Sequence, residues 1–294
     1  MRKAYLFIFF VALVSIAIGG LLFLSTGNFS FITQDKADTK PTNTKTISLD
    51  NSNEIYIKAS SANINVIAED RDDVKVNLIS SKNSISTYTE DNKLYITVAP
   101  ISNKNFFFNF GASARLNIIL PKNFSNKLSV GSSSGNMSLS NMTLSNLDCS
   151  TSSGNQTMKD LLITTLSSSS SSGTISSTSI TAVNSSFKSS SGAISLKKFS
   201  GNVVTSTSSG NTKIDYKEFS NTLTANSSSG SVRITLPGNS EFNLNATSSS
   251  GNVNCSFPIE VNDNRKKNTL QGTVKNDKNK IFIRTASGNI SINN

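Results

Sequence analysis

The chain has 294 residues, a formal net charge of +10, and neither histidine nor tryptophan. Histidine is the commonest general base and the commonest transition-metal ligand, so its absence argues against most acid–base enzymes and most transition-metal sites. We therefore expect a non-catalytic binding or scaffolding protein with no cofactor and no metal ion.

An apolar segment opens the chain. Residues 4–31 carry no charged side chain, and about 20 apolar residues suffice to span a bilayer. Arg2 and Lys3 precede this segment, which predicts a cytoplasmic N-terminus and an extracellular C-terminal domain. We expect residues 1–26 to be a single-pass transmembrane anchor, followed by a flexible linker at 27–45. A cleaved signal peptide is the alternative.

Residues 46–129 show irregular strand patterns. Ser61-Ala62-Asn63 resembles a tight corner, and Ile55 and Ile57 precede it with the spacing of two that marks one buried strand face. Longer alternating runs follow. We interpret the whole range as an irregular N-terminal β segment that caps a larger domain, with strands near 73–80, 84–90, 92–98 and 113–120.

Residues 130–294 are built from a repeat. Ser-Ser-Gly or a close variant recurs, and its first six intervals are 19, 19, 19, 18, 20 and 21 residues. Apolar residues recur two and four places after the glycine, and seven and five places before the next one. Repeats of this length indicate stacked supersecondary units. The glycines are Gly135, Gly154, Gly173, Gly192, Gly210, Gly230, Gly251 and Gly288.

This register predicts coils of about 19 residues, each made of a strand, a tight corner, a second strand and a looser return. The fold class is therefore all-β, a single-stranded parallel β-helix (β-solenoid) that we expect to be right-handed. Glycine would turn the corner because it tolerates positive φ. The serine before it would bond corner backbone groups. Cys149 and Cys255 fall on inward positions five coils apart, too far for a disulfide.

Two surface features are candidate contacts. Residues 260–280 form a basic insertion that could bind an anionic wall polymer or lipid headgroups, or could simply be a solvated loop. The aromatic run at 106–110 is either an exposed hydrophobic tip or a cap over the open end of the solenoid. The residues concerned are Arg265, Lys266, Lys267, Lys275, Lys278 and Lys280, and Phe106, Phe107, Phe108 and Phe110.

Two short segments of the sequence match catalytic motifs by chance. Gly131-Ser132-Ser133-Ser134-Gly135 has the spacing of a nucleophile elbow, but it is one copy of the repeat corner and no histidine could activate Ser133. Ser195-Leu196-Lys197-Lys198 would need a desolvated lysine, whereas both lysines fall at the exit of a coil. Neither motif indicates an enzyme.

Together these features resemble a bacterial family known as putative adhesins, whose membrane-anchored members include the Lia-operon protein LiaG, associated with cell-envelope stress. The resemblance covers about residues 46–294. It implies an extracellular β-helical domain of unknown function and carries over no catalytic residue. The residues that carry it are 55–64, 106–110, 120–122, the Ser-Ser-Gly ladder, 270–273 and 281–292.

We therefore expect a membrane-anchored, surface-exposed protein of the bacterial cell envelope. It would bind or scaffold wall polymer, lipid or protein in an adhesin-like way, and a membrane protein is a further possible partner; no nucleic-acid partner is expected. The alternative is an accessory regulator or sensor of envelope stress that acts through membrane partners.

Overall fold

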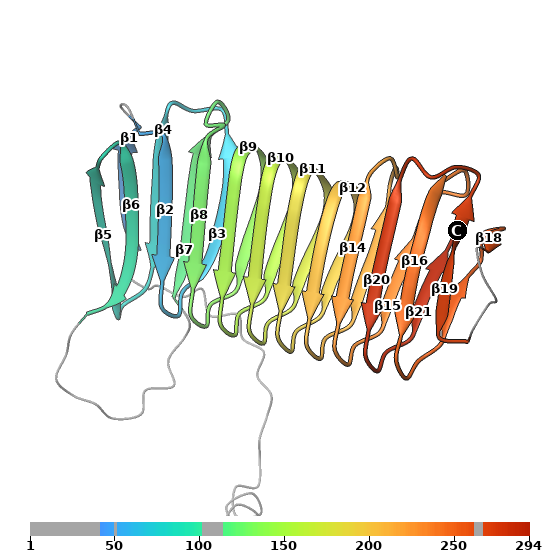
Figure 1. Cartoon of the computed structure of the whole chain (residues 1–294). Coiled ribbons are helices and arrows are strands. Elements are labelled where there is room, and N and C mark those ends of the chain that lie inside the picture. Colours follow the sequence, from blue (N-terminus) through green and yellow to red (C-terminus); the bar gives the residue numbers. More distant parts are fainter. Residues whose placement is uncertain (1–41, 50–51, 102–113, 262–266) are drawn as a thin grey trace, which may run out of the picture. The chain divides into compact units, whose positions relative to one another are not determined.

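The computed structural model describes residues 42–49, 52–101, 114–261 and 267–294, and in this part of the chain all regular structure is β (Figure 1). The expected anchor at 1–26 and the aromatic run at 106–110 lie outside it. The strands are β1 (Thr42–Ser48), β2 (Glu54–Ala59), β3 (Asn63–Glu69), β4 (Asp73–Ile79), β5 (Asn83–Glu90), β6 (Lys93–Pro100), β7 (Arg115–Pro121), β8 (Lys127–Ser132), β9 (Met137–Thr151), β10 (Gln156–Ser170), β11 (Ile175–Ser189), β12 (Ile194–Thr207), β13 (Thr212–Tyr216), β14 (Thr222–Ser227), β15 (Val232–Thr235), β16 (Phe242–Ser248), β17 (Val253–Cys255), β18 (Glu260–Val261), β19 (Thr269–Val274), β20 (Lys280–Thr285) and β21 (Ile290–Asn293).

The middle of the domain is a regular stack of coils. Strands β9 to β12 pair in parallel, and Gln156 of β10 lies between Met137 of β9 and Ile175 of β11. These partners occupy the same place in successive repeats, as the 19-residue period predicts. β1 begins at Thr42, so the last four residues of the expected linker belong to a strand.

Each regular coil has three sides. The long strands bend at a residue with positive φ, which is Asn141, Asp160, Ser179 or Lys198 in successive coils. The segment after the bend is itself a short β side, and in β10 it buries Leu161 and Ile163. The expected loose return is therefore wrong, because this segment is a third β side of the coil. Aspartate and asparagine tolerate left-handed backbone well, which fits two of the four bends.

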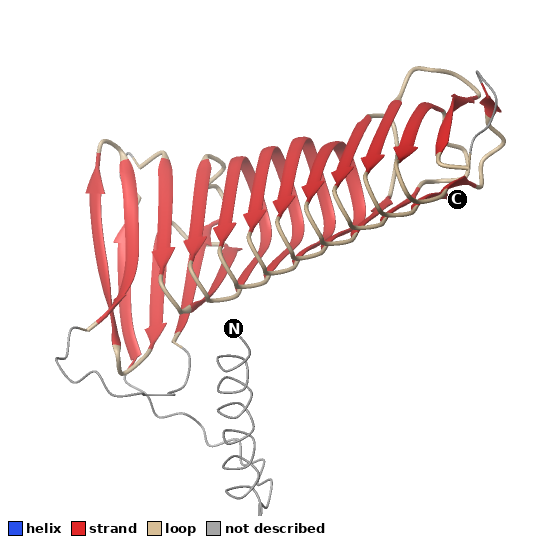
Figure 2. Cartoon of the chain, turned by 60° about the horizontal axis from the view of Figure 1, so that its bottom comes forward, coloured by secondary structure: helices blue, strands red, loops and turns tan. Residues whose placement is uncertain are grey.

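The eight corner glycines have a different role from the one predicted. None of them has positive φ; among the described glycines only Gly201 does. A Cβ placed on Gly173 would instead lie 1.9 Å from the carbonyl oxygen of Gly154 on the neighbouring coil. Figure 2 shows these corners following one another along the edge of the stack. Glycine is required because stacked backbones approach each other too closely for a side chain.

The corner hydroxyl that bonds the backbone lies three residues before the glycine, not one. The amide of Gly154 donates to Thr151 Oγ1 at 3.0 Å, and the amide of Gly230 donates to Ser227 Oγ at 2.8 Å. The serine directly before each glycine is exposed. The eight corners therefore present a continuous row of serines to solvent.

The order of coils in space differs from their order in the sequence at the C-terminal end. Strands β20 and β21 lie between the coil of β14 and β15 and the coil of β16 and β17. The last coil of the chain is thus inserted one place inside the stack. Cys149 and Cys255 are consequently six coils apart rather than five, roughly 29 Å at the spacing of stacked strands. Cys149 is buried as predicted, whereas Cys255 is only half-buried.

At the N-terminal end, too, the order of the coils in space differs from their order in the sequence. Strands β2 and β3 pair directly with β8 and β9, and also with β6 and β7 on their other side. The 72 residues between Ala62 and Gly135 are enough for almost four coils, but they do not form four coils between these two corners. They leave the stack, form β4 to β7 beyond the first coil, and return. Antiparallel pairing of β1 with β4 and of β5 with β6 completes this end.

Candidate binding surfaces

The predicted basic insertion does not form one surface. Lys267 precedes β19, and its carbonyl accepts the amide of Val253 near the Ser-Ser-Gly corner. Lys275, Lys278 and Lys280 follow β19, at the opposite end of that strand. Arg265 and Lys266 lie outside the described residues. Among the described residues, three of the six predicted basic residues therefore follow β19, and Lys267 lies at the other end of that strand.

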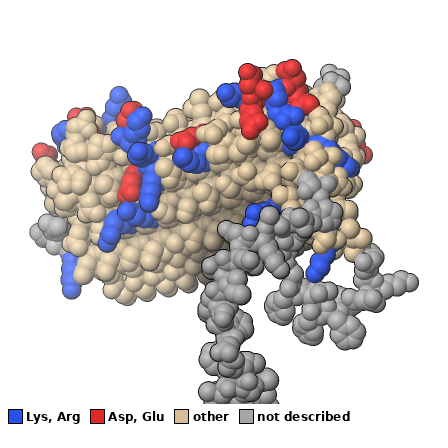
Figure 3. All heavy atoms as spheres, turned by 180° about the vertical axis from the view of Figure 1, so that it is seen from behind, with Lys and Arg blue, Asp and Glu red and all other residues tan. Residues whose placement is uncertain are grey.

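Acidic side chains lie close to Lys275 and Lys278 and reduce the positive charge there. Lys275 Nζ lies 3.9 Å from Glu241 Oε1 and donates to the Asn239 carbonyl at 3.0 Å. Lys278 lines a polar cavity of about 520 Å³ with Glu218 and Glu241. Figure 3 shows basic and acidic side chains mixed along the edge opposite the serine corners, which are at the bottom of Figure 1. Long-range attraction of an anionic surface to this mixed edge would be modest.

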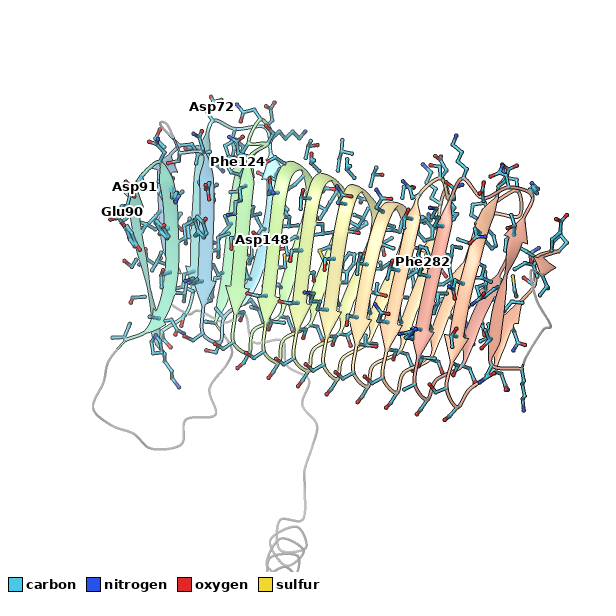
Figure 4. The ribbon with its side chains drawn as sticks, viewed as in Figure 1. Asp72, Glu90, Asp91, Phe124, Asp148 and Phe282 are labelled. Atoms are coloured by element: carbon cyan, nitrogen blue, oxygen red, sulfur yellow. The ribbon has the colours of Figure 1, made fainter. Side chains whose placement is uncertain are left out.

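The sheet that faces the viewer in Figures 1 and 4 has a long row of outward side chains at equivalent positions. We call it the outer row, and both Asp148 and Phe282, which Figure 4 labels, belong to it. Most of its members are small or polar. In spatial order the row is Tyr88, Tyr95, Tyr56, Ser129, Asp148, Ser167, Ser186, Val204, Thr224, Phe282, Asn245 and Gln271.

Three tyrosines at the N-terminal end of the outer row form a stacked column. The ring centroids of Tyr88 and Tyr95 are 4.8 Å apart with 12° between their planes, and those of Tyr95 and Tyr56 are 5.2 Å apart with 16° between them. Lys127 Nζ lies 5.4 Å from the centroid of Tyr56. Tyr88 belongs to β5, which is the outermost of the described strands at this end of the sheet, and is 51% exposed.

A polar network holds the inner end of this tyrosine column. The Tyr56 hydroxyl donates to Glu54 Oε2 at 2.5 Å, Lys127 Nζ donates to the Tyr56 hydroxyl at 3.2 Å, and the lysine lies 3.4 Å from the carboxylate. The hydrogen bond from Tyr56 lowers the pKa of Glu54, with Lys127 contributing. The hydrogen bond to Tyr56, together with the Glu54 charge, raises the pKa of Lys127. Both groups therefore stay charged at neutral pH.

A notch lies beside the column, two residues further along the same strands. It has a volume of about 360 Å³, and Gly131 of β8 forms part of its lining. Gly131 leaves a gap in the row of outward side chains between Lys58 and Ser150. The other lining residues are Lys58, Ala59, Ser60, Thr97, Val98, Ala99, Ser132 and Ser133.

Sequence reasoning missed the tyrosine column, although part of the signal was present. Asp91 and Asn92 both have positive φ and form a two-residue hairpin turn, a geometry that Asn and Asp favour. Such a turn places Tyr88 directly opposite Tyr95. The third ring could not be found this way, because β2 pairs with β6 across more than 30 residues of chain.

The described ranges contain no group of three or more His, Cys, Asp or Glu residues that could hold a metal ion. Asp70, Arg71 and Asp72 form the turn between β3 and β4, where Arg71 Nε donates to Asp73 Oδ1 at 2.7 Å. No helix in the part of the chain that the structure describes is long and apolar enough to cross a membrane.

Comparison with known proteins identifies the family. A crystal structure described as a putative adhesin from Bacteroides fragilis NCTC 9343 has 15% identity and a TM-score of 0.50, covering 86% of this chain and 98% of that one. One described as a putative lipid binding protein from Parabacteroides distasonis ATCC 8503 has 18% identity and a TM-score of 0.46, covering 87% and 97%. No curated protein matches this sequence. A family model described as Toastrack DUF4097 matches residues 52–293, and the chain therefore belongs to the Toastrack DUF4097 family.

Proposed function

We propose that this protein is a membrane-anchored, surface-exposed and non-catalytic β-solenoid of the bacterial cell envelope, which binds or scaffolds wall polymer, lipid or protein. The observation that carries the proposal is the repetition of short polar side chains along the stack. Ser129, Ser167 and Ser186 repeat on the outer row, and the exposed serine row repeats at the corners. Regular spacing lets many weak contacts act together on an extended partner.

The stack is suited to such contacts because it is braced between coils. Asn136 Oδ1 accepts the amide of Asn155, and Asn155 Oδ1 accepts the amide of Thr174, each at 2.9 Å. These bonds link neighbouring coils outside the strand ladders. A surface held in this way loses little conformational entropy on binding. The right-handed winding predicted from the sequence is compatible with this role.

The contact we propose for an anionic polymer or headgroup is formed by Lys278 and Lys280, which follow the C-terminal end of β19. The test is co-sedimentation of the full-length protein with wall sacculi and with anionic liposomes, at low and high salt. Exposed electrostatic contacts weaken as salt screens them. We expect binding at low salt that falls when Lys278 and Lys280 become glutamine. Changing Lys188 and Lys197 to glutamine is the matched control, because both are exposed and lie on other coils.

Absence of binding to both materials at low salt would refute the polymer and lipid contacts. The regulatory alternative would then lead, and the search would turn to membrane protein partners. Binding that both double variants reduce equally would mean that net charge, and not this position, drives the contact.

A further inference from the structure

The tyrosine column is an exception within a repeated surface. All positions of the outer row share the same outward place on stacked strands, and Ser129, Asp148 and Ser167 continue the row beyond Tyr56. Stability of the sheet does not require aromatic rings there, because most of the stack does without them. Cross-strand aromatic pairs do stabilise sheets, but three at one exposed edge leave ring surface in water.

The column is held in position before any ligand arrives. Both ring pairs are nearly parallel, and the Tyr56 hydroxyl is fixed between Glu54 and Lys127. Lys127 covers the inner end of the column. The outer end at Tyr88 is 51% exposed, because among the described strands β5 pairs with β6 alone. A preorganised aromatic surface binds with a small entropy cost.

Gly131 supplies an independent observation. A Cβ placed on Gly131 would lie 3.4 Å from Ser150 Oγ and 4.0 Å from the Ile57 carbonyl, which are ordinary contacts. Its φ is not positive. Unlike the corner glycines, it therefore has no steric or conformational need to be glycine. Glycine inside a strand is destabilising because it loses more conformational freedom on folding than other residues, and what it provides here is the space of the notch.

We infer that the tyrosine column and the Gly131 notch together form a binding site for an uncharged sugar chain. Pyranose rings have apolar C–H faces that pack against aromatic rings, and hydroxyls that bond to polar groups; mixed linings of this kind are typical of small-molecule sites. The notch offers hydroxyls from Thr97, Ser132 and Ser133, the Lys58 side chain, and apolar surface from Ala99. One sugar fits the notch, and its neighbours in the chain lie along the tyrosines, about 7 Å away along the strand.

This site is separate from the lysines near the end of β19. It lies at the other end of the stack. Its affinity would be insensitive to salt because the sugar chain is uncharged, so that neither the stacking nor the hydrogen bonds, that from Lys58 included, pair opposite charges. Failure of the anionic contact and failure of the sugar site can therefore be told apart in the same preparation.

Tyrosine fluorescence provides the assay. The chain has five tyrosines and no tryptophan, and three of the five form the column. The full-length protein is titrated with the hexasaccharides of β-1,4-linked N-acetylglucosamine and of β-1,4-linked glucose, and calorimetry confirms the affinity. We expect at least one to bind with a change in fluorescence, and with an affinity unchanged by added salt.

Two variants locate the site. Gly131→Leu fills the notch and Tyr88→Ala removes the open ring; each is expected to weaken binding about tenfold or more. Ser169→Leu is the matched control, because Ser169 occupies the position equivalent to Gly131 two coils away. Thermal unfolding checks that Gly131→Leu leaves the fold intact. Binding of neither hexasaccharide would overturn the inference, and so would binding that Gly131→Leu leaves unchanged.

Discussion

The two kinds of glycine in this fold predict opposite effects on stability for the same substitution, glycine to alanine. At Gly173, alanine would place its Cβ 1.9 Å from the Gly154 carbonyl oxygen, whereas real Cβ atoms essentially never come within 3.0 Å of a neighbour. The coils would have to separate locally by about 1.1 Å, the difference between these distances. At Gly131 the same methyl group meets nothing closer than 3.4 Å.

The cost at Gly173 follows from the bonds that this separation would strain. Ser171 and Ser172 donate backbone hydrogen bonds to the neighbouring coil at 3.2 and 2.9 Å, and an extra ångström would break both. Each bond contributes about 1 kcal/mol net, and overpacking adds about 1–3 kcal/mol. We therefore expect Gly173→Ala to lower the free energy of unfolding by about 3–5 kcal/mol. Gly131→Ala should raise it by about 0.4–1 kcal/mol, because alanine restricts the unfolded chain.

Urea unfolding followed by circular dichroism measures both values in the full-length protein. The opposite signs are the informative result, since the substitution is chemically identical. Equal effects at the two positions, or a stable Gly173→Ala protein, would refute the argument that close approach of stacked backbones demands glycine at the corners.

Three further predictions concern buried and networked side chains. Ser168 Oγ donates to the fully buried Gln156 Oε1 at 2.7 Å, so Ser168→Ala should cost about 1–3 kcal/mol in urea unfolding, whereas combining it with Gln156→Leu should restore most of the loss. Burial raises the pKa of the Cys149 thiol to about 12 from 9.0. The stability that this raised pKa contributes is complete below about pH 9 and is lost as pH rises toward 12. Peptide mapping should find the Cys149 thiol unalkylated at pH 8 until urea unfolds the protein. Tyr56→Phe removes the main hydrogen bond that lowers the pKa of Glu54, so an NMR titration should show that pKa rising, and an unchanged value would contradict the assigned cause.

The candidate sites show what can and what cannot be predicted from residues that are neighbours in the sequence. The basic insertion was visible in the sequence as five lysines and one arginine, but a strand of six residues separates Lys267 from Lys275. Sequence proximity therefore did not imply one surface. The sugar site shows the converse, because Tyr56, Tyr95 and Gly131 are distant in sequence and meet only where β6, β2 and β8 stack.

The sequence by itself determined the length of the coil and the two sides that flank its Ser-Ser-Gly corner. The 19-residue period, the inward pairs on each side of the corner and the burial of Cys149 all follow from alternation within a strand, which depends on near neighbours in the chain. The tertiary structure alone decided which coil lies on which. Every coil presents a similar corner and a similar ladder edge, so local pattern does not distinguish one stacking partner from another. Only the packing of the complete stack places β20 and β21 inside β16 and β17, and β2 between β6 and β8.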